Sequence, residues 1–309
     1  MSADQSWPKI AVAGAGAVGG YFGGMLARAG APVVFIGRPS FVEAVAKDGL
    51  LLDTTTFKER VKAEASADLS AVRGAEIVLF CVKTTDTAST AKELADFLAP
   101  GTLLVSMQNG ADNAEQIHAA SGLQALAAAV YVAASVPAAG TVKHVGRGDL
   151  VLGPDHEKTR RVAELFTRAK VPCRISENLV GELWTKLVWN CALNALSALG
   201  KVTYGEIIAS ADAKQLLEGT VYEVLAVAHA AGIKPPGLDD PQAALAGAYK
   251  IAEQMAATRS STAQDMMRGK KTEIDSLNGF VARKGRGLGV PTPLNHALYT
   301  LVKLAEASF

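Results

Sequence analysis

One stretch of otherwise apolar, helix-forming sequence carries a lysine and two asparagines at helical spacing. In GELWTKLVWNCALN, residues 181–194, the polar positions Lys186, Asn190 and Asn194 recur at every fourth residue. At about 100° per residue, they share one narrow stripe of a helix. A protonated lysine can donate a proton and stabilise a developing negative charge, and carboxamides can hold a polar molecule in register. The stripe therefore has the groups of a proton-donating site.

A plainer interpretation is a solvated surface stripe, with Glu182 and Lys186 forming an i, i+4 ion pair worth about 0.2–0.5 kcal/mol. The rest of the helix argues against it, because apolar side chains cover most of the other directions: Leu183, Trp184, Leu187, Val188, Trp189, Leu193 and Leu196. A helix that is apolar nearly all round is buried, and a buried, unpaired amide costs about 1–3 kcal/mol. We therefore expect the stripe to face a cleft or a partner.

The composition is that of an ordinary globular protein. The chain has 309 residues, 49% of them hydrophobic and 20% charged, which is long enough for two domains with sizeable cores. Its net charge is +1, from 31 basic and 30 acidic residues, without a long basic block, so we expect no nucleic-acid partner. Neither a signal peptide nor a membrane span is visible, so we expect no membrane partner and a cytoplasmic location.

Neither the cysteines nor the histidines are spaced as metal ligands. Cys81, Cys173 and Cys191 are odd in number, which indicates a reducing compartment and argues against a disulfide framework or a zinc site. The histidines are isolated from one another and from the cysteines; they are His118, His144, His156, His229 and His296. We therefore expect no metal.

The pattern along the chain changes about halfway. Up to about residue 177, short β-branched runs recur, namely KIAVAG, PVVFIG, EIVLFCV, TLLVSM, ALAAAVYV and DLVLG. Helix-length segments separate several of them, which is typical of βαβ units and a parallel sheet. Beyond this point the sequence predicts helices, over about 180–199, 205–231, 241–257, 261–284 and 292–307. The predicted fold class is α/β, with a Rossmann-type dinucleotide-binding domain over residues 1–177 and an all-α domain over 178–309.

The first predicted strand runs directly into GAGAVGG. Gly14, Gly16 and Gly19 have G-x-G-x-x-G spacing, with Ala17 and Val18 between them, and a predicted helix follows. Such glycines allow a tight turn and let backbone N–H groups approach a pyrophosphate at the positive end of the helix. A glycine-rich turn is the plainer interpretation, but the strands and the helix around it lie where a dinucleotide-binding unit needs them.

The identity of the dinucleotide depends on the end of the second predicted strand, where NAD enzymes usually carry Asp or Glu for the ribose 2′-hydroxyl. This chain has FIGRPS there. The Arg38 guanidinium cannot accept a hydrogen bond but suits a 2′-phosphate, with Ser40 as a second donor. The sequence therefore predicts NADP(H) rather than NAD(H); the alternative is an exposed loop arginine.

Two further loops follow predicted strands, where ligands bind in open α/β sheets. LFCVKTTDT places Lys83 and Thr84 just past one strand, and LLVSMQNGADN places Gln108, Asn109 and Gly110 just past the next. Plain turn chemistry is the alternative, since Asn-Gly is a common turn dipeptide. Their shared position on the cofactor side favours cofactor or substrate contact.

Four motifs in this order resemble those of the ketopantoate reductases (2-dehydropantoate 2-reductases), enzymes of pantothenate synthesis in the 6-phosphogluconate-dehydrogenase-like group. They are the glycine loop, the VKTTDT and QNG loops, the W-x-K-L-x-x-N-x-x-x-N helix, and RSSTAQDMMRGKKTEIDSLNG near the C-terminal end. The resemblance covers almost the full length. It implies NADPH-dependent reduction of ketopantoate, a small 2-oxo acid, to pantoate.

The resemblance also implies roles for individual residues. Lys186 would be the catalytic proton donor, and Glu273 the acid that orients the substrate hydroxyl and the lysine. The implied substrate contacts are Asn109, Asn190, Asn194 and Ser261, and the implied cofactor contacts are Gly14, Gly16, Ala17, Val18, Gly19, Arg38, Lys83 and Asn109. From the residues alone, Ser261 with Gln264 has capping-box spacing and could start a helix. Glu273 could likewise be a solvated helix charge.

Two positions depart from the family pattern on the substrate side. Better-known members have asparagines where this chain has Tyr204 and Thr258. We predict a 2-dehydropantoate 2-reductase. One alternative is a related 2-oxo acid reductase or 2-hydroxy acid dehydrogenase acting on another branched or aromatic acid, and another is a regulator that binds NADP(H) without chemistry. The apolar helical half favours a homodimer over a monomer.

Overall fold

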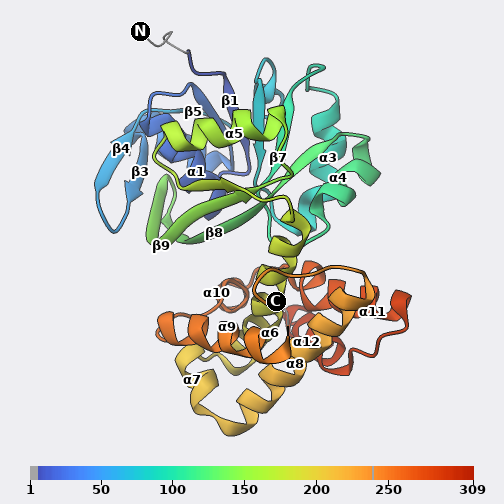
Figure 1. Cartoon of the computed structure of the whole chain (residues 1–309). Coiled ribbons are helices and arrows are strands. Elements are labelled where there is room, and N and C mark those ends of the chain that lie inside the picture. Colours follow the sequence, from blue (N-terminus) through green and yellow to red (C-terminus); the bar gives the residue numbers. More distant parts are fainter. Residues whose placement is uncertain (1–5, 239) are drawn as a thin grey trace. The chain divides into compact units, whose positions relative to one another are not determined.

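The protein divides into two compact units. The computed structural model describes residues 6–238 and 240–309, which Figure 1 traces by sequence colour. The α/β unit comprises Met1–Gln108 and Asp112–Leu179, and the helical unit comprises Asn109–Ala111 and Val180–Phe309. The short segment Asn109–Ala111 therefore belongs by its contacts to the helical unit, although it lies in the N-terminal half of the sequence.

Within the residues that the structure describes, a ten-stranded mixed sheet forms the centre of the α/β unit. Its strands are β1 (Ile10–Ala13), β2 (Val33–Ile36), β3 (Leu50–Asp53), β4 (Lys58–Val61), β5 (Glu64–Ser66), β6 (Ile77–Phe80), β7 (Leu103–Ser106), β8 (Ala125–Ala138), β9 (Thr141–Leu152) and β10 (Cys173–Ile175). The order is β4-β3-β9-β8-β7-β6-β1-β2-β5, and β10 pairs with β9. The part from β8 to β5 is parallel. Strand order reverses beside β1, and such switch points are where ligands bind in open α/β sheets.

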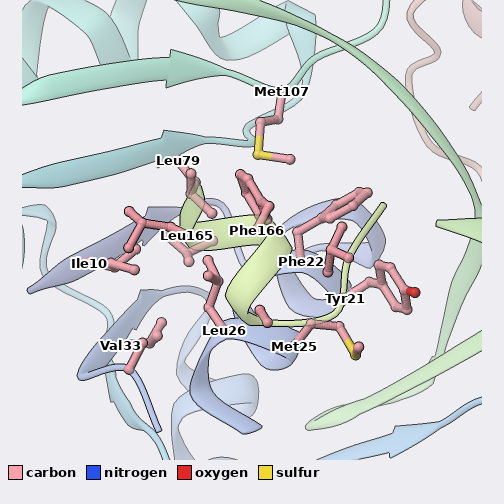
Figure 2. Packing of buried hydrophobic residues seen from close by; sticks show 14 of the residues in the cluster. Ile10, Tyr21, Phe22, Met25, Leu26, Val33, Leu79, Met107, Leu165 and Phe166 are labelled. Carbon is pink, nitrogen blue, oxygen red and sulfur yellow. The ribbon is translucent and has the colours of Figure 1, made fainter. Parts of the chain in front are cut away.

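Alternating side chains of the central strands build a core on each face of the sheet. One face packs against α1 (Ala17–Arg28), α2 (Pro39–Asp48) and α5 (Glu157–Arg168). Figure 2 shows this core, in which the rings of Phe22 and Phe166 meet edge to face with centroids 5.9 Å apart. The other face packs against α3 (Thr87–Ala95) and α4 (Asn113–Ser121). Burial on both faces explains the continuous apolar runs IAVA and VVFI.

The prediction of a parallel sheet was incomplete. β8 and β9 form a long antiparallel pair with register shifts, and β3 and β4 form a second one. The edge strands β4 and β5 read KERV and EAS, so their charges hid them in the sequence. The apolar run DLVLG indicated only the C-terminal end of β9, because the earlier residues of that strand alternate between buried and accessible positions.

The helical unit is built around α6 (Leu179–Gly200). The helices that follow are α7 (Tyr204–Ala209), α8 (Ala211–Ala230), α9 (Pro241–Gln254), α10 (Ser261–Met267), α11 (Asn278–Leu288) and α12 (Pro293–Glu306). The described part of this unit contains no strand. The predicted fold class, an α/β domain followed by an all-α domain, is confirmed. No helix within residues 6–238 and 240–309 has the length and apolarity needed to cross a membrane.

Two predicted helices are interrupted. The segment expected over 205–231 breaks at Ser210, whose backbone is extended and whose side chain accepts a hydrogen bond from Ala213 N to start α8. The segment expected over 261–284 breaks after α10, where Gly269 has φ +61°, and a 3₁₀ turn, η3 (Ile274–Ser276), precedes α11. The first break was missed because Ser210 is a single cap residue with helix-forming residues on both sides. The second was missed because Lys270, Lys271 and Glu273, all good helix formers, lie within the irregular segment that follows Gly269.

The burial of α6 agrees with its sequence. Trp184, Val188 and Leu193 are at most 2% exposed, and the Trp184 ring lies 5.7 Å from that of Phe280. The prediction of a helix buried nearly all round is therefore confirmed. Glu182 is itself only 7% exposed, so the stripe is not a solvated surface feature.

Candidate active site

The glycines of the GAGAVGG loop have two different roles. Gly14 (φ +103°) follows β1, and a Cβ there would lie 2.7 Å from backbone atoms of Cys81 and Val82. A Cβ on Gly19 would lie 2.2 Å from the Gly14 carbonyl oxygen. Both positions require glycine because the neighbouring backbone leaves no room. A Cβ on Gly16 would meet nothing within 4 Å, so open space lies at the start of α1.

The first turn of α1 borders this open space. Gly16 is the N-cap and provides no side-chain hydrogen bond, and Ala17 and Val18 open the helix with no acidic residue in the first turn. The first N–H groups of a helix lack partners within it, and the helix dipole favours an anion beside them. The loop therefore fits the pyrophosphate of a dinucleotide.

Arg38 lies past the end of β2, at the same edge of the sheet as the glycine loop. The two loops are joined, because Gly14 N and Ala15 N both donate to Ile36 O, at 3.1 and 3.0 Å. Arg38 is the N-cap residue of α2, and both Arg38 and Ser40 are exposed. Their side chains are thus accessible beside the glycine loop, where a phosphate could be held.

Lys83 and Gln108 lie in the loops that follow β6 and β7. Lys83 is half-buried and precedes a 3₁₀ turn, η2 (Thr84–Asp86). Gln108 is 5% exposed, and its Nε2 donates to Val82 O at 3.0 Å and to Thr87 Oγ1 at 2.8 Å. Gln108 therefore ties its own loop to the Lys83 loop. These hydrogen bonds explain why a polar side chain is buried at this position, and no ligand contact is needed to explain it.

Asn109 bridges the lysine of the polar stripe and Glu273. Lys186 Nζ donates to Asn109 Oδ1 at 2.8 Å, and Asn109 Nδ2 donates to Glu273 Oε2 at 2.9 Å. The charges determine how the carboxamide is turned, because the opposite orientation would set its NH₂ group against an ammonium and its oxygen against a carboxylate. Asn109 is 77 positions from Lys186 and 164 from Glu273, so only the fold brings these groups together.

Asn194 is hydrogen-bonded to a residue that departs from the family pattern. Tyr204 OH donates to Asn194 Oδ1 at 3.2 Å, and the two residues are 8% and 4% exposed. Burial raises the pKa of the Tyr204 hydroxyl well above its usual value, so it remains a neutral donor. Tyr204 N also donates to Thr258 O at 3.0 Å. The two unusual positions therefore lie side by side, and one of them holds a carboxamide of the stripe.

Asn190 and Ser261 are not part of these hydrogen bonds. Asn190 is half-buried and Ser261 is exposed, and their substrate contacts stay predictions.

The idea that Ser261 caps a helix was wrong by one residue. Ser260, which is 1% exposed, is the N-cap of α10: its Oγ accepts from Ala263 N and donates to Asn194 O, both at 3.0 Å. The spacing between Ser261 and Gln264 had suggested a capping box, but the Gln264 side chain donates to Arg259 O instead. Nothing in the sequence indicated that Ser260 reaches the backbone of the Asn194 helix.

The cysteines offer no reactive thiolate. All three are free thiols, and burial raises the pKa of Cys81 and Cys191, and that of Cys173 to about 11. A thiol that stays protonated is a poor nucleophile. Among the residues that the structure describes, no group of His, Cys, Asp and Glu side chains is arranged to hold a metal ion.

Two family models together match most of the chain. The one described as Ketopantoate reductase PanE/ApbA matches residues 10–157, and the one described as Ketopantoate reductase PanE/ApbA C terminal matches residues 178–306. The chain belongs to the ketopantoate reductase family. The resemblance drawn from the four motifs is thereby confirmed.

Relatives of the ketopantoate reductase family match over nearly the full length. The 2-dehydropantoate 2-reductase of Pyrococcus abyssi (strain GE5 / Orsay) is 31% identical over 304 residues, which cover 97% of this chain and 98% of the relative. A PanE/ApbA family ketopantoate reductase structure from Ralstonia eutropha JMP134 is 46% identical with a TM-score of 0.91, and the match covers 97% of this chain and 99% of that one.

A second similar structure is the ternary structure of D-mandelate dehydrogenase with NADH and anilino(oxo)acetate. It has a TM-score of 0.89 at 23% identity, and the match covers 97% of this chain and 98% of that one. At this identity the likeness concerns the fold alone. Together, the family models and the relatives make this chain a member of a family of NAD(P)-dependent oxidoreductases.

The contrast between Gly16 and Gly19 generates a prediction for the ketopantoate reductase glycine loop. Gly16→Ala is expected to keep the melting temperature of the wild type but to bind a nicotinamide dinucleotide about tenfold more weakly. Its methyl group enters the open space and displaces a charge-assisted hydrogen bond worth about 1.5 kcal/mol. Gly19→Ala is expected to lose about 1–3 kcal/mol of stability through overpacking. Circular dichroism melts and isothermal titration of the dinucleotide measure both effects. Equal affinity in Gly16→Ala and the wild type would contradict the assignment of this loop.

Proposed function

We propose that this chain is an NADPH-dependent 2-dehydropantoate 2-reductase that reduces ketopantoate to pantoate with Lys186 as the proton donor. The observation that carries the proposal is the hydrogen-bonded series Lys186, Asn109 and Glu273, with distances of 2.8 and 2.9 Å. Relatives named 2-dehydropantoate 2-reductase, which match over nearly the full length, support the same substrate.

Reduction of a 2-oxo acid adds a hydride to the ketone carbon and a proton to the ketone oxygen. Negative charge grows on that oxygen as the hydride arrives, so a proton donor must already be in place. The Lys186 ammonium supplies both charge stabilisation and the proton, and it regains a proton from solvent before the next turnover. Asn109 holds the ammonium through Oδ1, and Glu273 holds Asn109 in the orientation that makes this possible.

The two asparagines of the stripe would position the substrate. Asn190 and Asn194 lie about one and two turns along α6 from Lys186. The Asn194 oxygen already accepts a hydrogen bond from Tyr204, so its Nδ2 is the group that donates to a carboxylate or keto oxygen. Such contacts hold the reacting carbon in place for hydride transfer.

NADPH, when bound, supplies the hydride. The glycine loop and the start of α1 fit its pyrophosphate, and the exposed Arg38 and Ser40 suit a 2′-phosphate. Residues 33–42 contain no Asp or Glu that could bind the ribose hydroxyl of NADH. Asp68, past the neighbouring strand β5, accepts a hydrogen bond from Ser70 N at 2.8 Å and so serves as a cap. These features support NADPH as the cofactor.

A second candidate function is the reduction of a 2-oxo acid with a different branched or aromatic side chain. Tyr204 is the observation that favours it, because its ring adds apolar surface beside Asn194 and its hydroxyl proton is already donated there. That hydroxyl is therefore not a donor for the hydroxyl group of 2-dehydropantoate. The same fold also serves a D-mandelate dehydrogenase.

The first test follows the loss of NADPH absorbance when the purified protein meets 2-dehydropantoate, beside branched and aromatic 2-oxo acids and beside NADH. Lys186→Ala is expected to lower turnover by about 10²–10⁴-fold, the usual contribution of a general acid, with the Kd for NADPH unchanged. Lys250→Ala, which removes an exposed lysine of α9, is the control and should keep wild-type turnover. A Lys186→Ala enzyme that retains most of its turnover would exclude this lysine from the mechanism.

Arg38→Ala tests the choice of cofactor. Losing a hydrogen bond between charged groups costs about 1.5–3 kcal/mol, so the Kd for NADPH should rise about 10- to 100-fold while that for NADH stays nearly constant. Lys47→Ala, at the other end of α2, is the matched control. Equal losses of affinity for the two dinucleotides would refute the 2′-phosphate assignment.

Tyr204 is tested by two substitutions that separate its hydroxyl from its ring. Tyr204→Phe removes the hydrogen bond to Asn194 and should raise the KM for the 2-oxo acid about 3- to 10-fold, which corresponds to about 0.5–1.5 kcal/mol. Tyr204→Asn removes the ring and should shift kcat/KM toward 2-dehydropantoate, relative to an aromatic 2-oxo acid, by about tenfold or more. Unchanged ratios in steady-state assays would show that Tyr204 does not select the substrate.

A further inference from the structure

Glu273 lies on a short segment with little regular structure of its own. α10 ends at Met267, Gly269 has a positive φ of +61°, and Glu273 directly precedes the three-residue turn η3. Irregular segments are more mobile than helices unless other groups hold them. Glu273 Oε2 must nevertheless stay at 2.9 Å from Asn109 Nδ2 to complete the hydrogen-bonded series. The residues on either side of it therefore have to be anchored from outside the segment.

The residue before Glu273 is held by a buried carboxylate. Glu306, the last residue of α12, accepts hydrogen bonds from Thr272 N at 2.6 Å and from Thr272 Oγ1 at 2.5 Å. Thr272 is 1% exposed and the Glu306 side chain 5%. Thr272 Oγ1 also accepts a hydrogen bond from Ile274 N at 3.2 Å, so this hydroxyl connects the residue before Glu273 to the residue after it. Burial opposes ionisation of Glu306, but hydrogen bonds from Thr272 and Lys303 outweigh it and lower the pKa of Glu306.

The second residue after Glu273 is held by side chains of α11 and α12. Asp275 accepts from Tyr299 OH at 3.0 Å and from Lys303 Nζ at 3.0 Å. Its backbone oxygen accepts from Arg283 Nη2 at 2.7 Å. Both the side chain and the backbone of Asp275 are therefore tied to the helices behind the segment.

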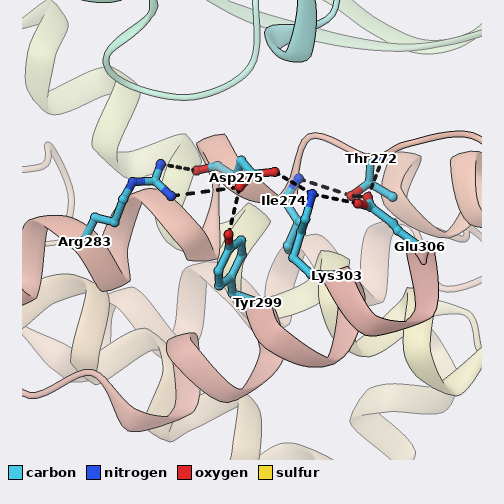
Figure 3. Close-up of polar contacts among 7 residues, drawn as sticks. All are labelled: Thr272, Ile274, Asp275, Arg283, Tyr299, Lys303 and Glu306. Atoms are coloured by element: carbon cyan, nitrogen blue, oxygen red, sulfur yellow. Dashed lines mark hydrogen bonds and ion pairs between the residues drawn. The ribbon is translucent and has the colours of Figure 1, made fainter.

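Lys303 links the two anchors. Its Nζ pairs with Asp275 Oδ2 at 3.0 Å and with Glu306 Oε2 at 2.9 Å, as Figure 3 shows. Burial by itself would lower the pKa of Lys303, but the hydrogen bonds from its ammonium to the two carboxylates raise it above the usual value. Thr272, Asp275, Lys303 and Glu306 therefore form a clip that holds the backbone on both sides of Glu273.

We propose that Thr272 and Glu306 are positioning residues for Glu273. The clip sets the place of the Glu273 carboxylate and, through Asn109, that of the Lys186 ammonium. This inference rests on the proposed reductase function, because it concerns the same site. The physical reason is distance: a shift of about 1 Å in a catalytic site can lower a rate by about 100-fold.

Thr272→Val tests the proposal, because valine keeps the shape of threonine and removes the hydroxyl. Turnover of the 2-oxo acid is expected to fall about 10- to 100-fold, with the Kd for NADPH unchanged. Thr220→Val is the matched control, since Thr220 is 0% exposed in α8 and its Oγ1 donates to Leu216 O at 2.7 Å. This control loses an equally buried hydroxyl outside the clip and should keep wild-type turnover.

A double-mutant cycle with Glu273→Ala separates positioning from general stability. If Thr272 acts through Glu273, Thr272→Val has no further effect on turnover once the Glu273 side chain is absent. A merely structural Thr272 would lower turnover by the same factor in both backgrounds, and that result would overturn the proposal. Thr272→Ser keeps the hydroxyl and is expected to restore turnover.

Amide hydrogen exchange over residues 270–277 supplies a readout that does not depend on activity. Thr272→Val should speed exchange in this segment, and Thr220→Val should not. If Thr272→Val fails to fold, Glu306→Gln replaces it in both assays, with a smaller effect in the same direction. Wild-type exchange together with wild-type turnover would refute the clip. A Glu273→Ala enzyme with wild-type turnover would instead refute the catalytic role proposed for Glu273.

Discussion

The carboxamide of Asn109 is the group on which the rest of the site depends. It accepts a hydrogen bond from an ammonium at 2.8 Å and donates one to a carboxylate at 2.9 Å, so a neutral side chain keeps two opposite charges in register. Because each charge requires a different end of the amide, the orientation of Asn109 follows from electrostatics. The arrangement then requires that three distant segments, the loop after β7, α6 and the residues before η3, each be held with little freedom.

Each of the three segments is held by a different kind of interaction. The loop after β7 is tied down by Gln108, whose side chain is bonded to the neighbouring loop. α6 is held by apolar packing on most sides, and by Asn278, whose Nδ2 donates to the carbonyl oxygen of Cys191 at 3.1 Å. The Glu273 segment is held by charged and hydroxyl groups of α12. Polar anchors suit this last segment because it has no amphipathic helix to pack against a core.

The two ends of the proposed reaction place different demands on the sequence. At the glycine loop the demand is steric: backbone atoms crowd Gly14 and Gly19, whereas Gly16 faces open space. On the substrate side the demand is for hydrogen bonds among buried groups, and Tyr204 meets it by bonding to Asn194. A steric demand tolerates almost no variation. A hydrogen-bonding demand can be met by several side chains, which explains how two positions of the family pattern can change while the hydrogen bonds among Lys186, Asn109 and Glu273 stay in place.

The sequence by itself determined the fold class, the glycine loop, the burial of α6 and the membership of the family, because these depend on local periodicity and on motifs read within one segment. It missed the edge strands β4 and β5, which carry charged residues, and the breaks in two predicted helices, such as the one at Ser210. Only the tertiary structure decided that Asn109 lies between Lys186 and Glu273, that Ser260 rather than Ser261 caps α10, and that Tyr204 meets Asn194. The reason is physical: Asn109 bonds to residues 77 and 164 positions away, Ser260 also donates to Asn194 O 66 positions away, and Tyr204 and Asn194 lie on different helices. Such partners are chosen by the packing of whole helices rather than by any pattern that neighbouring residues carry.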